Sequence, residues 1–597
     1  MIARRPPALS AVRLRALLRS PLTWVVLLTG IVRVVGIGWG LPASDGWDND
    51  GVAPRDFLAG LVETVTPGHF YTYPPVHLLL LALLTSPSTI TALVRAPSLG
   101  RADVVSEIIQ VPYMTANAYV ARAVSLVMSL AIVVFMAKIA AELRGMTVSG
   151  PEDPRAKRAG VAAAAFAAAN VSLTYYAHTS NLDVPYLFWA TASLLAFVQV
   201  LARKDPSRLR RALVLAVLAV GTKDQAYALF VLSVPVALVA LLVVAPWRKG
   251  ERGKFLRALA AGIGVALCLF LLTDAVVLNP TGFRARVAFL VGPASKDFVT
   301  FTNDWTGRWA MLRDAARHVD RHYPALLALV GASGIVIALV RAAKAPRGEL
   351  GHRLLVAAFP LLAAISFMVA FNFAALRTDH RFFMPHSVLL AVYGGIAIEP
   401  LVFAPRTVVR VAGQAAFSLL FACAIHTCLA VDANLLGDPR YEAEAWLREQ
   451  VRPGDLLETY GNNVYLLRFP SESRVIRVGP EPLSRRNPLP DVTEVQAPFG
   501  DANDVRRPRY VVLMGGWMWR YLISAHPDLA PGEVMPKTHS ETATDPEGTT
   551  FFARLTRSMD AYRVVRGFKY RPYFFPMLDI HASTAREVWI YERKPGL

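Results

Sequence analysis

Long apolar runs recur along this chain of 597 residues, from its N-terminal region to about residue 430. Each approaches the roughly 20 residues that a helix needs to cross a hydrocarbon layer of about 30 Å. A segment that crosses a bilayer must satisfy its own backbone hydrogen bonds, so runs of this length indicate membrane helices. We therefore predict a multi-span α-helical membrane protein. The clearest runs are Pro21–Leu41, Ala123–Ala141, Val184–Leu201, Phe255–Leu278, Pro324–Val340, Leu354–Ala375 and Val411–Ala430.

The charged residues lie mainly between the apolar runs, and most of them are basic. They make up 18% of the chain, and the net charge is +19. Such a charge suits a nucleic-acid-binding protein, but cytoplasmic loops of membrane proteins carry the same excess of lysine and arginine. Because the basic residues cluster in short connections between apolar runs, we predict no nucleic-acid partner. These connections are Arg144–Arg158, Arg203–Arg211, Arg248–Arg257, Arg341–Arg353 and the weaker Pro400–Arg410.

The basic connections also predict the topology. If they and a basic tail of residues 1–20 are cytoplasmic, an even number of crossings separates each pair, which gives about eleven spans. A catalytic membrane domain would then cover residues 21–430, with outer loops at residues 42–117 and 279–323. We predict a plasma (inner) membrane protein with a cytoplasmic N-terminus. Within the outer loops, Pro74–Leu84 is predicted to form a short surface helix, and Asp304–His322 an amphipathic helix on the membrane.

The composition changes after Val431, where no further run of spanning length occurs. We predict that residues 431–597 form a small extracytoplasmic α/β domain, because a helical spacing is followed by several short strand patterns. The helix is expected at Tyr441–Gln450. Strands are expected at Asp455–Tyr460, Arg509–Met514 and Glu587–Glu592, and the proline-rich stretch Ser484–Pro508 is expected to be a loop.

The predicted topology brings many ionisable residues to one face of the membrane. Charged side chains at membrane depth are costly, and they tend to mark functional sites. Apolar helices beneath such a cluster suit a substrate with a phosphate head and a long hydrocarbon tail. The residues are Asp48, Asp50, Arg55, Tyr73 and His77 in the first outer loop, Asp183 and Lys223 at the next two outer turns, and His380 and Arg381 at the last.

Several of these residues, taken alone, have more than one interpretation. Asp48 and Asp50 are placed to act as a general base, to bind a divalent cation through oxygen, or to belong to a hydrated acidic turn. Lys223 suits either a lipid phosphate or an interfacial lysine that snorkels to water. Arg381 can bind a phosphate with two parallel hydrogen bonds, or it can anchor the end of a membrane helix. Asp183 can interact favourably with the positive N-terminal end of a helix.

The order of several short motifs resembles that of a known family. The motifs are Gly40-Leu41-Pro42, Asp48-Asn49-Asp50-Gly51, Tyr73-Pro74-Pro75, Asp183-Val184-Pro185, Thr222-Lys223, Asn279-Pro280, and Arg381 with Pro385. In this order they are similar to the GT-C glycosyltransferase superfamily, in particular to the family 39 and aminoarabinose-transferase-like branch that uses polyprenyl-phosphate sugars. The sequence departs from the family at Gly51, where a glutamate is usual.

The resemblance implies a GT-C-like fold and an inverting sugar transfer from a polyprenyl-phosphate carrier to the hydroxyl of a lipid, glycan or protein acceptor. It implies that Asp50 or Asp48 is the catalytic base, that Asp183 supports the acceptor or a metal, and that Lys223 and Arg381 hold the lipid phosphate. A divalent metal ion at Asp48 and Asp50 is the cofactor that we consider. The neighbouring candidates for substrate binding are His380, Tyr73, His77 and Arg55.

Two other classes of protein share some of these features. A secondary transporter also has many spans and intramembrane charges, but it usually shows inverted repeats and ionisable residues near the midplane of the membrane. We find no repeat in this chain, and the charges gather at one face. A membrane scaffold that presents the outer domain would need no cluster of aspartate, lysine and arginine. Both classes remain as alternatives to the transferase.

Overall fold

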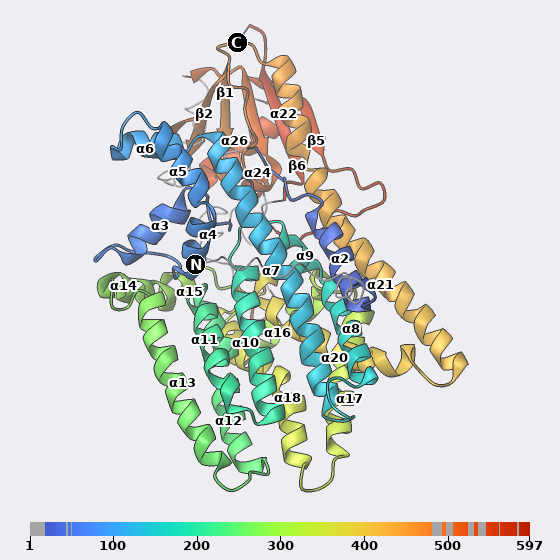
Figure 1. The fold of residues 1–597 in the computed structure, drawn as a ribbon. Coiled ribbons are helices and arrows are strands. Elements are labelled where there is room, and N and C mark those ends of the chain that lie inside the picture. The colour runs from blue at the N-terminus through green and yellow to red at the C-terminus, as the bar shows by residue number, and fades with distance from the viewer. Residues whose placement is uncertain are drawn as a thin grey trace.

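The computed structural model describes residues 18–42, 46–48, 50–461, 463–479, 492–496, 499, 506–522, 530–534, 545–559, 561–581 and 584–596. Most of the predicted cytoplasmic tail, residues 1–20, lies outside the described residues. The chain forms a bundle of long helices, with a sheet-containing part at one end of the bundle (Figure 1). This arrangement confirms the predicted multi-span helical protein with a small C-terminal α/β domain.

Eight helical segments among the described residues are long and apolar enough to cross a membrane. They are α7 (Val111–Gly145), α10 (Asp183–Arg203), η2 with α12 (Asp224–Leu229 and Ser233–Val244), α13 (Glu251–Thr273), α17 (Ala325–Ala343), α18 with its continuation (Leu350–Ala375), α20 (His380–Val402) and α21 (Thr407–Leu436). Each coincides with a predicted crossing. The protein is therefore an integral membrane protein.

The remaining three of the roughly eleven predicted crossings form helices of 12 to 15 residues, which is below spanning length. These are α2 (Pro21–Val34), α8 (Pro154–Ala168) and α11 (Leu209–Val220). The helix α8 ends where Asn170 accepts a hydrogen bond from the backbone of Leu173 and so begins a separate short helix, α9 (Val171–Ala177). Hydropathy alone counts such broken helices as full crossings.

The two predicted outer loops are largely helical. The first contains α3 (Asp56–Val65), α4 (Val76–Leu84), α5 (Ser86–Arg95) and α6 (Arg101–Ile108), and α4 and α5 meet at a bend of 60°. The second contains α14 (Pro280–Val291), α15 (Pro293–Lys296), α16 (Trp305–Arg317) and η3 (Val319–Arg321). The predicted amphipathic helix corresponds to α16, which buries Ala310 and Met311 and exposes Trp305 and Trp309.

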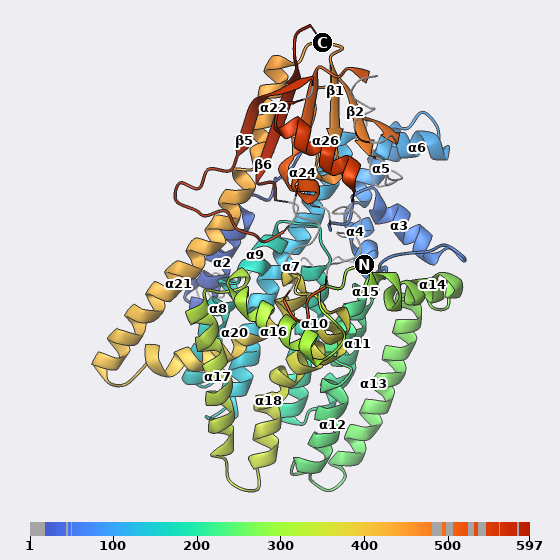
Figure 2. The same ribbon diagram turned by 180° about the vertical axis from the view of Figure 1, so that it is seen from behind.

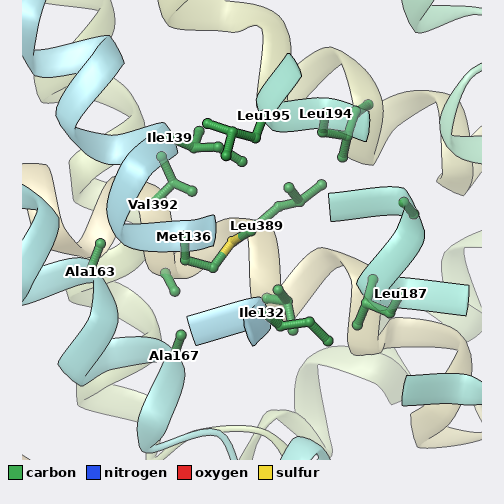
Figure 3. Close-up of a cluster of buried hydrophobic side chains, with 14 of the residues drawn as sticks. Ile132, Met136, Ile139, Ala163, Ala167, Leu187, Leu194, Leu195, Leu389 and Val392 are labelled. Carbon is green, nitrogen blue, oxygen red and sulfur yellow. The ribbon is translucent and has the colours of Figure 1, made fainter. Parts of the chain in front are cut away.

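The helices pack through small residues and interlocking aliphatic side chains. Figure 3 shows Ile132, Met136 and Ile139 of α7 between residues of α8, α10 and α20. The approach of α20 to α8 requires Gly395, because a Cβ atom at this position would lie 2.4 Å from the carbonyl oxygen of Ala159. Small residues at such crossings let membrane helices pack closely.

The C-terminal domain begins with α22 (Pro439–Gln450) and contains one six-stranded sheet of order β3-β2-β1-β4-β6-β5. The neighbours β3, β2, β1 and β4 are parallel, while β6 and β5 are antiparallel to their neighbours. The strands are β1 (Leu456–Tyr460), β2 (Arg474–Gly479), β3 (Val492–Gln496), β4 (Tyr510–Met514), β5 (Tyr562–Lys569) and β6 (Glu587–Arg593), with helices α24 (Gly515–Leu522) and α26 (Pro546–Thr556) beside them.

The structure confirms the three predicted strands and the helix at residues 441–450. It also contains three strands that the sequence did not indicate, namely β2, β3 and β5. The stretch Ser484–Pro508 was expected to be a loop, and this was wrong for Val492–Gln496, which pairs with β2 through the full length of the strand. β3 is an edge strand with several polar residues, so its sequence lacks the alternation of apolar and polar residues by which a strand is recognised.

The sheet domain is fastened to the helical bundle by contacts close to the first outer loop (Figure 2). The indole of Trp39 donates to Asp438 at 3.0 Å, and the indole of Trp47 donates to the carbonyl of Leu466 at 2.9 Å. The guanidinium of Arg440 lies 3.9 Å from the centre of the Trp47 ring, a cation–π contact. These contacts fix the chain immediately before the acidic motif.

Candidate active site

The acidic motif of the first outer loop is held between the bundle and the sheet domain. The backbone N–H of Asp50 donates to Asp48 Oδ1 at 3.3 Å. Two residues further along the loop, Val52 exchanges hydrogen bonds with Ser180, at 3.3 Å through its N–H and at 3.1 Å through its carbonyl. Ser180 lies in the turn between α9 and α10, so two predicted outer turns meet here.

Gly51 stands where the resembled family usually has a glutamate. A Cβ atom at this position would lie 2.6 Å from Ser180 Oγ and 2.8 Å from Asp48 Oδ2. The space that a side chain at position 51 would enter is therefore taken by Ser180 and by the carboxylate of Asp48. The departure from the family pattern has a local steric reason in this protein.

Asp50 is bound by two cationic side chains on a single oxygen. Its Oδ2 lies 2.5 Å from Arg381 Nη1 and 2.8 Å from His581 Nε2. Arg381 is in turn paired with Asp379, at 3.0 Å from Nε to Oδ2. Burial alone would raise the pKa of Asp50, but Arg381 and His581 outweigh burial and hold this pKa well below its usual range. Asp50 is therefore a carboxylate at any physiological pH.

Asp48 has the opposite environment although it is only two residues away. Its side chain is buried, and its Oδ2 has no hydrogen-bond partner among the described residues. Burial raises the pKa of Asp48 to about 6, against the opposing charges of His581 and Arg122. Two neighbouring carboxylates whose pKa values are pushed apart are typical of acid–base sites.

A second ion pair joins two other predicted outer turns. Lys223 Nζ donates to Asp183 Oδ1 at 2.7 Å, and Gln225 Nε2 donates to the same oxygen at 3.2 Å. The backbone of Lys223 is extended between α11 and η2, and this break turns the side chain into the protein. Asp183 is fully buried at the start of α10, and its second oxygen has no hydrogen-bond partner among the described residues.

The two ion pairs belong to one electrostatic environment. The charge of Lys223 contributes to the low pKa of Asp50, and both Arg381 and Asp50 influence the pKa of Lys223, which burial lowers. Four of the predicted residues, Asp50, Asp183, Lys223 and Arg381, therefore lie together, although 331 residues of sequence separate Asp50 from Arg381.

Two histidines of the site stack on two adjacent tyrosines of α9. His581 stacks on Tyr175 with ring centres 5.6 Å apart, and His380 stacks on Tyr176 at 5.4 Å. His380 Nδ1 lies 3.5 Å from Asp379, and its Nε2 has no hydrogen-bond partner in the described part of the chain. The predicted residue His380 thus belongs to the cluster.

The other predicted binding residues are less closely connected to it. His77 is buried on α4, and neither ring nitrogen has a hydrogen-bond partner in the described ranges. Arg55 pairs with its neighbour Asp56 at 3.7 Å. Tyr73 is half-buried and lies close enough to Arg377, a charged residue of the last outer turn, to influence its pKa. Their part in binding stays a prediction.

The same holds for the divalent metal ion. Among the described residues, no group of three or more His, Cys, Asp or Glu side chains is arranged to hold one. The Oδ2 atom of Asp50 is already engaged by the guanidinium of Arg381 and by Nε2 of His581, and the arginine charge would repel a cation. As they stand, these residues do not form a ligand set for a metal, and metal dependence is a matter for a chelator experiment.

Sequence reasoning missed His581, Tyr175 and Tyr176. His581 is a single histidine in the connection between β5 and β6, 531 residues from Asp50. No motif or periodicity surrounds it, so no signal in one sequence could have placed it beside Asp50. The adjacent tyrosines of α9 resemble ordinary packing residues of a membrane helix.

No protein-family model and no curated protein sequence matches the chain. Several solved structures are similar to it, and three of them follow. One is ArnT from Cupriavidus metallidurans bound to undecaprenyl phosphate, with 15% identity, a TM-score of 0.46, and coverage of 85% of this chain and 94% of that chain. The same protein in the apo state gives 14% identity, a TM-score of 0.44 and the same coverage, 85% and 94%. The third is the Archaeoglobus fulgidus oligosaccharyltransferase in complex with Zn and sulfate, with 13% identity, a TM-score of 0.42, and coverage of 95% and 88%.

Proposed function

We propose that the protein is a GT-C-type glycosyltransferase, which moves a sugar from a polyprenyl phosphate to an acceptor hydroxyl. The observation that carries the proposal is the buried cluster in which Asp50 is paired with Arg381 and Asp183 with Lys223, at one end of a bundle of membrane helices. Transfer of this kind needs a base for the acceptor and cations for the leaving phosphate. The cluster offers both within one electrostatic environment.

Lys223 and Arg381 are the candidates for binding the donor phosphate. In this structure each cation holds a carboxylate, at 2.7 Å and 2.5 Å. A phosphate forms strong charge-assisted bonds with both residue types, and arginine can bind it with two parallel bonds. The hydrocarbon tail of the donor would lie against the apolar surfaces of the membrane helices below the cluster.

Asp50 is the proposed general base. It is more accessible than Asp48, with 26% of its side chain exposed, and it touches the cation that would hold the phosphate. When the phosphate attracts Arg381, Asp50 loses one of the partners that depress its pKa, so its basicity rises as the donor binds. Asp48 lies behind it, and its raised pKa makes it the alternative base.

The transfer step then follows from these positions. The carboxylate of Asp50 takes the proton of the acceptor hydroxyl while the hydroxyl oxygen forms a bond to the anomeric carbon. The bond from that carbon to the phosphate oxygen breaks, its electron pair stays on the phosphate, and Lys223 and Arg381 stabilise the added charge. Attack from the face opposite the phosphate inverts the anomeric centre. Asp183 orients Lys223 and offers its second oxygen toward the acceptor.

The proposed orientation places the cluster and the C-terminal domain on the outer side of a plasma membrane, with the N-terminus in the cytoplasm. The basic connections between membrane helices support this orientation through the positive-inside rule. The acceptor is a lipid, glycan or protein hydroxyl that reaches the outer face.

The test is sugar transfer by the purified protein in lipid, with a panel of radiolabelled polyprenyl-phosphate sugars and acceptor-containing membrane extract. Turnover of one donor, lost in Asp50→Asn, is the expected result. Parallel reactions with EDTA decide whether a divalent ion takes part. A well-folded protein that turns over no donor, or one that keeps full activity in both Asp50→Asn and Asp48→Asn, would refute the proposal.

A further inference from the structure

The connection between β5 and β6 leaves the sheet domain and reaches into the membrane domain. It runs beside α21, where the rings of Phe574 and Phe575 lie 5.0 Å and 5.1 Å from the ring of His426 (Figure 2). Further along, the side-chain amide of Asn434 in α21 forms two hydrogen bonds with the backbone of the connection. Its Nδ2 donates to the carbonyl of Pro576 at 2.9 Å, and its Oδ1 accepts from the N–H of Leu578 at 2.7 Å. These contacts fix the course of the connection from Phe574 to Leu578.

The end of this connection is buried in the membrane domain. Ile580 is 5% exposed and belongs to the main hydrophobic core of the helical bundle. His581 follows, with only 8% of its side chain exposed, stacked on Tyr175 and bonded to Asp50. The hydrogen bond requires a proton on Nε2, because the carboxylate can only accept. The sheet domain thus contributes His581 to the cluster around Asp50.

Arg381 and His581 share the same oxygen of Asp50, but they differ in what happens when a donor binds. Arg381 also pairs with Asp379, and the proposed donor phosphate competes with Asp50 for its guanidinium. His581 is held by ring stacking and by the packing of its own connection, neither of which a phosphate disturbs. When Arg381 turns to the phosphate, His581 is the partner that keeps Asp50 in place.

We infer that His581 is a positioning residue for the transfer reaction, delivered to Asp50 by the β5–β6 connection, so that the C-terminal domain completes the active site. This inference rests on the proposed function. A general base contributes only while its carboxylate faces the acceptor hydroxyl, and a misplacement of about 1 Å can cost on the order of 10²-fold in rate. The sheet domain is therefore part of the catalytic unit and not only an attached module.

The experiment compares His581→Ala with His581→Gln in the full-length protein, with the donor that the wild-type protein turns over. The glutamine amide can donate to Asp50 from nearly the position of Nε2, whereas alanine cannot. We expect kcat to fall on the order of 10²-fold in His581→Ala and to recover at least tenfold in His581→Gln. The KM for the donor should change by less than about threefold, because the phosphate-binding cations are untouched.

Asp579→Asn is the matched control. Asp579 lies two residues before His581 in the same connection, is 67% exposed, and pairs with Arg321 and Arg586 at the surface. Exposed pairs of this kind contribute little, so kcat and KM should stay at the wild-type values. A fall in Asp579→Asn equal to that in His581→Ala would assign the effect to loss of the whole connection and would overturn the inference.

Two further outcomes separate the inference from the proposed function. If the wild-type protein transfers sugar and His581→Ala does so within twofold, the inference is wrong and the proposed function stands. The same conclusion follows if His581→Ala and His581→Gln fall equally, or if only the donor KM rises. If the folded wild-type protein transfers no sugar, the proposed function and the inference fail together.

Discussion

Two largely buried arginines of this protein, Arg381 and Arg286, each pair with two carboxylates, but their surroundings differ. Arg381 pairs with Asp50 and Asp379, and its side chain is 16% exposed. Arg286 pairs with Asp224 at 2.8 Å and Asp274 at 2.9 Å, and its side chain is only 2% exposed. The arginine of the first group is partly accessible, and that of the second is enclosed.

The difference lies in what surrounds each group. Arg286 is covered by the rings of Tyr71 and Phe283, at 4.8 Å and 5.5 Å, and it ties α14 to the end of α13 and to Asp224. Asp224 directly follows Lys223, so this enclosed group fixes the backbone beside the lysine that we propose to bind the donor phosphate. Arg381 instead shares Asp50 with a histidine from another domain. An enclosed triad suits stability, and a partly open one can exchange a carboxylate for a substrate phosphate.

The largest expected effect in the comparison is the loss of activity in Asp50→Asn. Removal of a general base costs roughly 10²- to 10⁴-fold, and transfer of the sugar from the best donor should fall by this amount. The unfolding midpoint in detergent should fall less than in a variant that removes a whole side chain of the pair, since asparagine can still accept from Arg381 and His581. Asp56→Asn, an exposed aspartate of the same loop, should keep wild-type activity. Retained transfer in Asp50→Asn would shift the role of base to Asp48.

Arg286→Met should behave in the opposite way and destabilise the fold. Removal of one partner from a buried ion pair leaves an uncompensated charge and costs about 3–5 kcal/mol. We expect a lower unfolding midpoint in detergent, measured by intrinsic fluorescence. The double variant Arg286→Met/Asp274→Asn should recover part of the loss, because one orphaned carboxylate is then neutral. Equal stability of wild-type protein and Arg286→Met would contradict the structural role of this triad.

Asp48→Asn should make the protein more stable at pH 7. The pKa of Asp48 is raised by burial from its ordinary value of 3.8 to about 6, so the folded protein binds this proton more tightly than the unfolded chain. The stability that this proton provides is complete below about pH 3.8 and is lost as the pH rises through about 6. The two-unit shift corresponds to up to about 3 kcal/mol.

The measurement is the unfolding midpoint of Asp48→Asn and wild-type protein between pH 4 and pH 7. The gain of the variant over the wild type should grow with pH in this window. A constant difference across the window would show that Asp48 keeps the same charge throughout. Asp50, whose pKa is depressed, contributes with the opposite sign, since its stabilising pairs weaken only in strong acid.

Arg381→Lys should have the smallest effect of the four. Lysine keeps the positive charge but cannot form two parallel bonds to a phosphate. Loss of one charged hydrogen bond corresponds to about 1.5–3 kcal/mol, or roughly 10- to 100-fold in kcat/KM. Steady-state kinetics over a range of donor concentrations would measure it. A variant as active as the wild type would show that Arg381 acts as a simple charge or as an anchor.

The sequence located a large part of the candidate site. Topology from the positive charges placed Asp50, Asp183, Lys223 and Arg381 at the same end of the bundle, and the structure pairs them with one another. This success has a simple cause, because residues at successive outer turns of a helical bundle must meet at one face. The predicted topology does not indicate which carboxylate pairs with which cation, because this pairing depends on how the helices pack.

The failures follow from the same limits. Hydropathy does not reveal that Asn170 separates α8 from α9, so it treats the two helices as one crossing. Sequence reasoning missed β2, β3 and β5, because charged residues interrupt the apolar pattern of these short segments, as Arg563 and Arg566 do in β5. It also assigned no role to His581, because no local pattern near this residue indicates its contact with Asp50, which lies 531 positions away.

The amino-acid sequence by itself determined that this chain crosses a membrane many times, which end of the bundle carries the charges, and that a smaller α/β domain follows the last crossing. These properties depend on apolar length and charge placement, which act locally along the chain. The tertiary structure alone decided that His581 of the sheet domain reaches Asp50, that Arg381 is shared while Arg286 is enclosed, and that Asp48 fills the space beside Gly51. Those outcomes depend on which surfaces pack together, and packing joins residues that no local pattern connects.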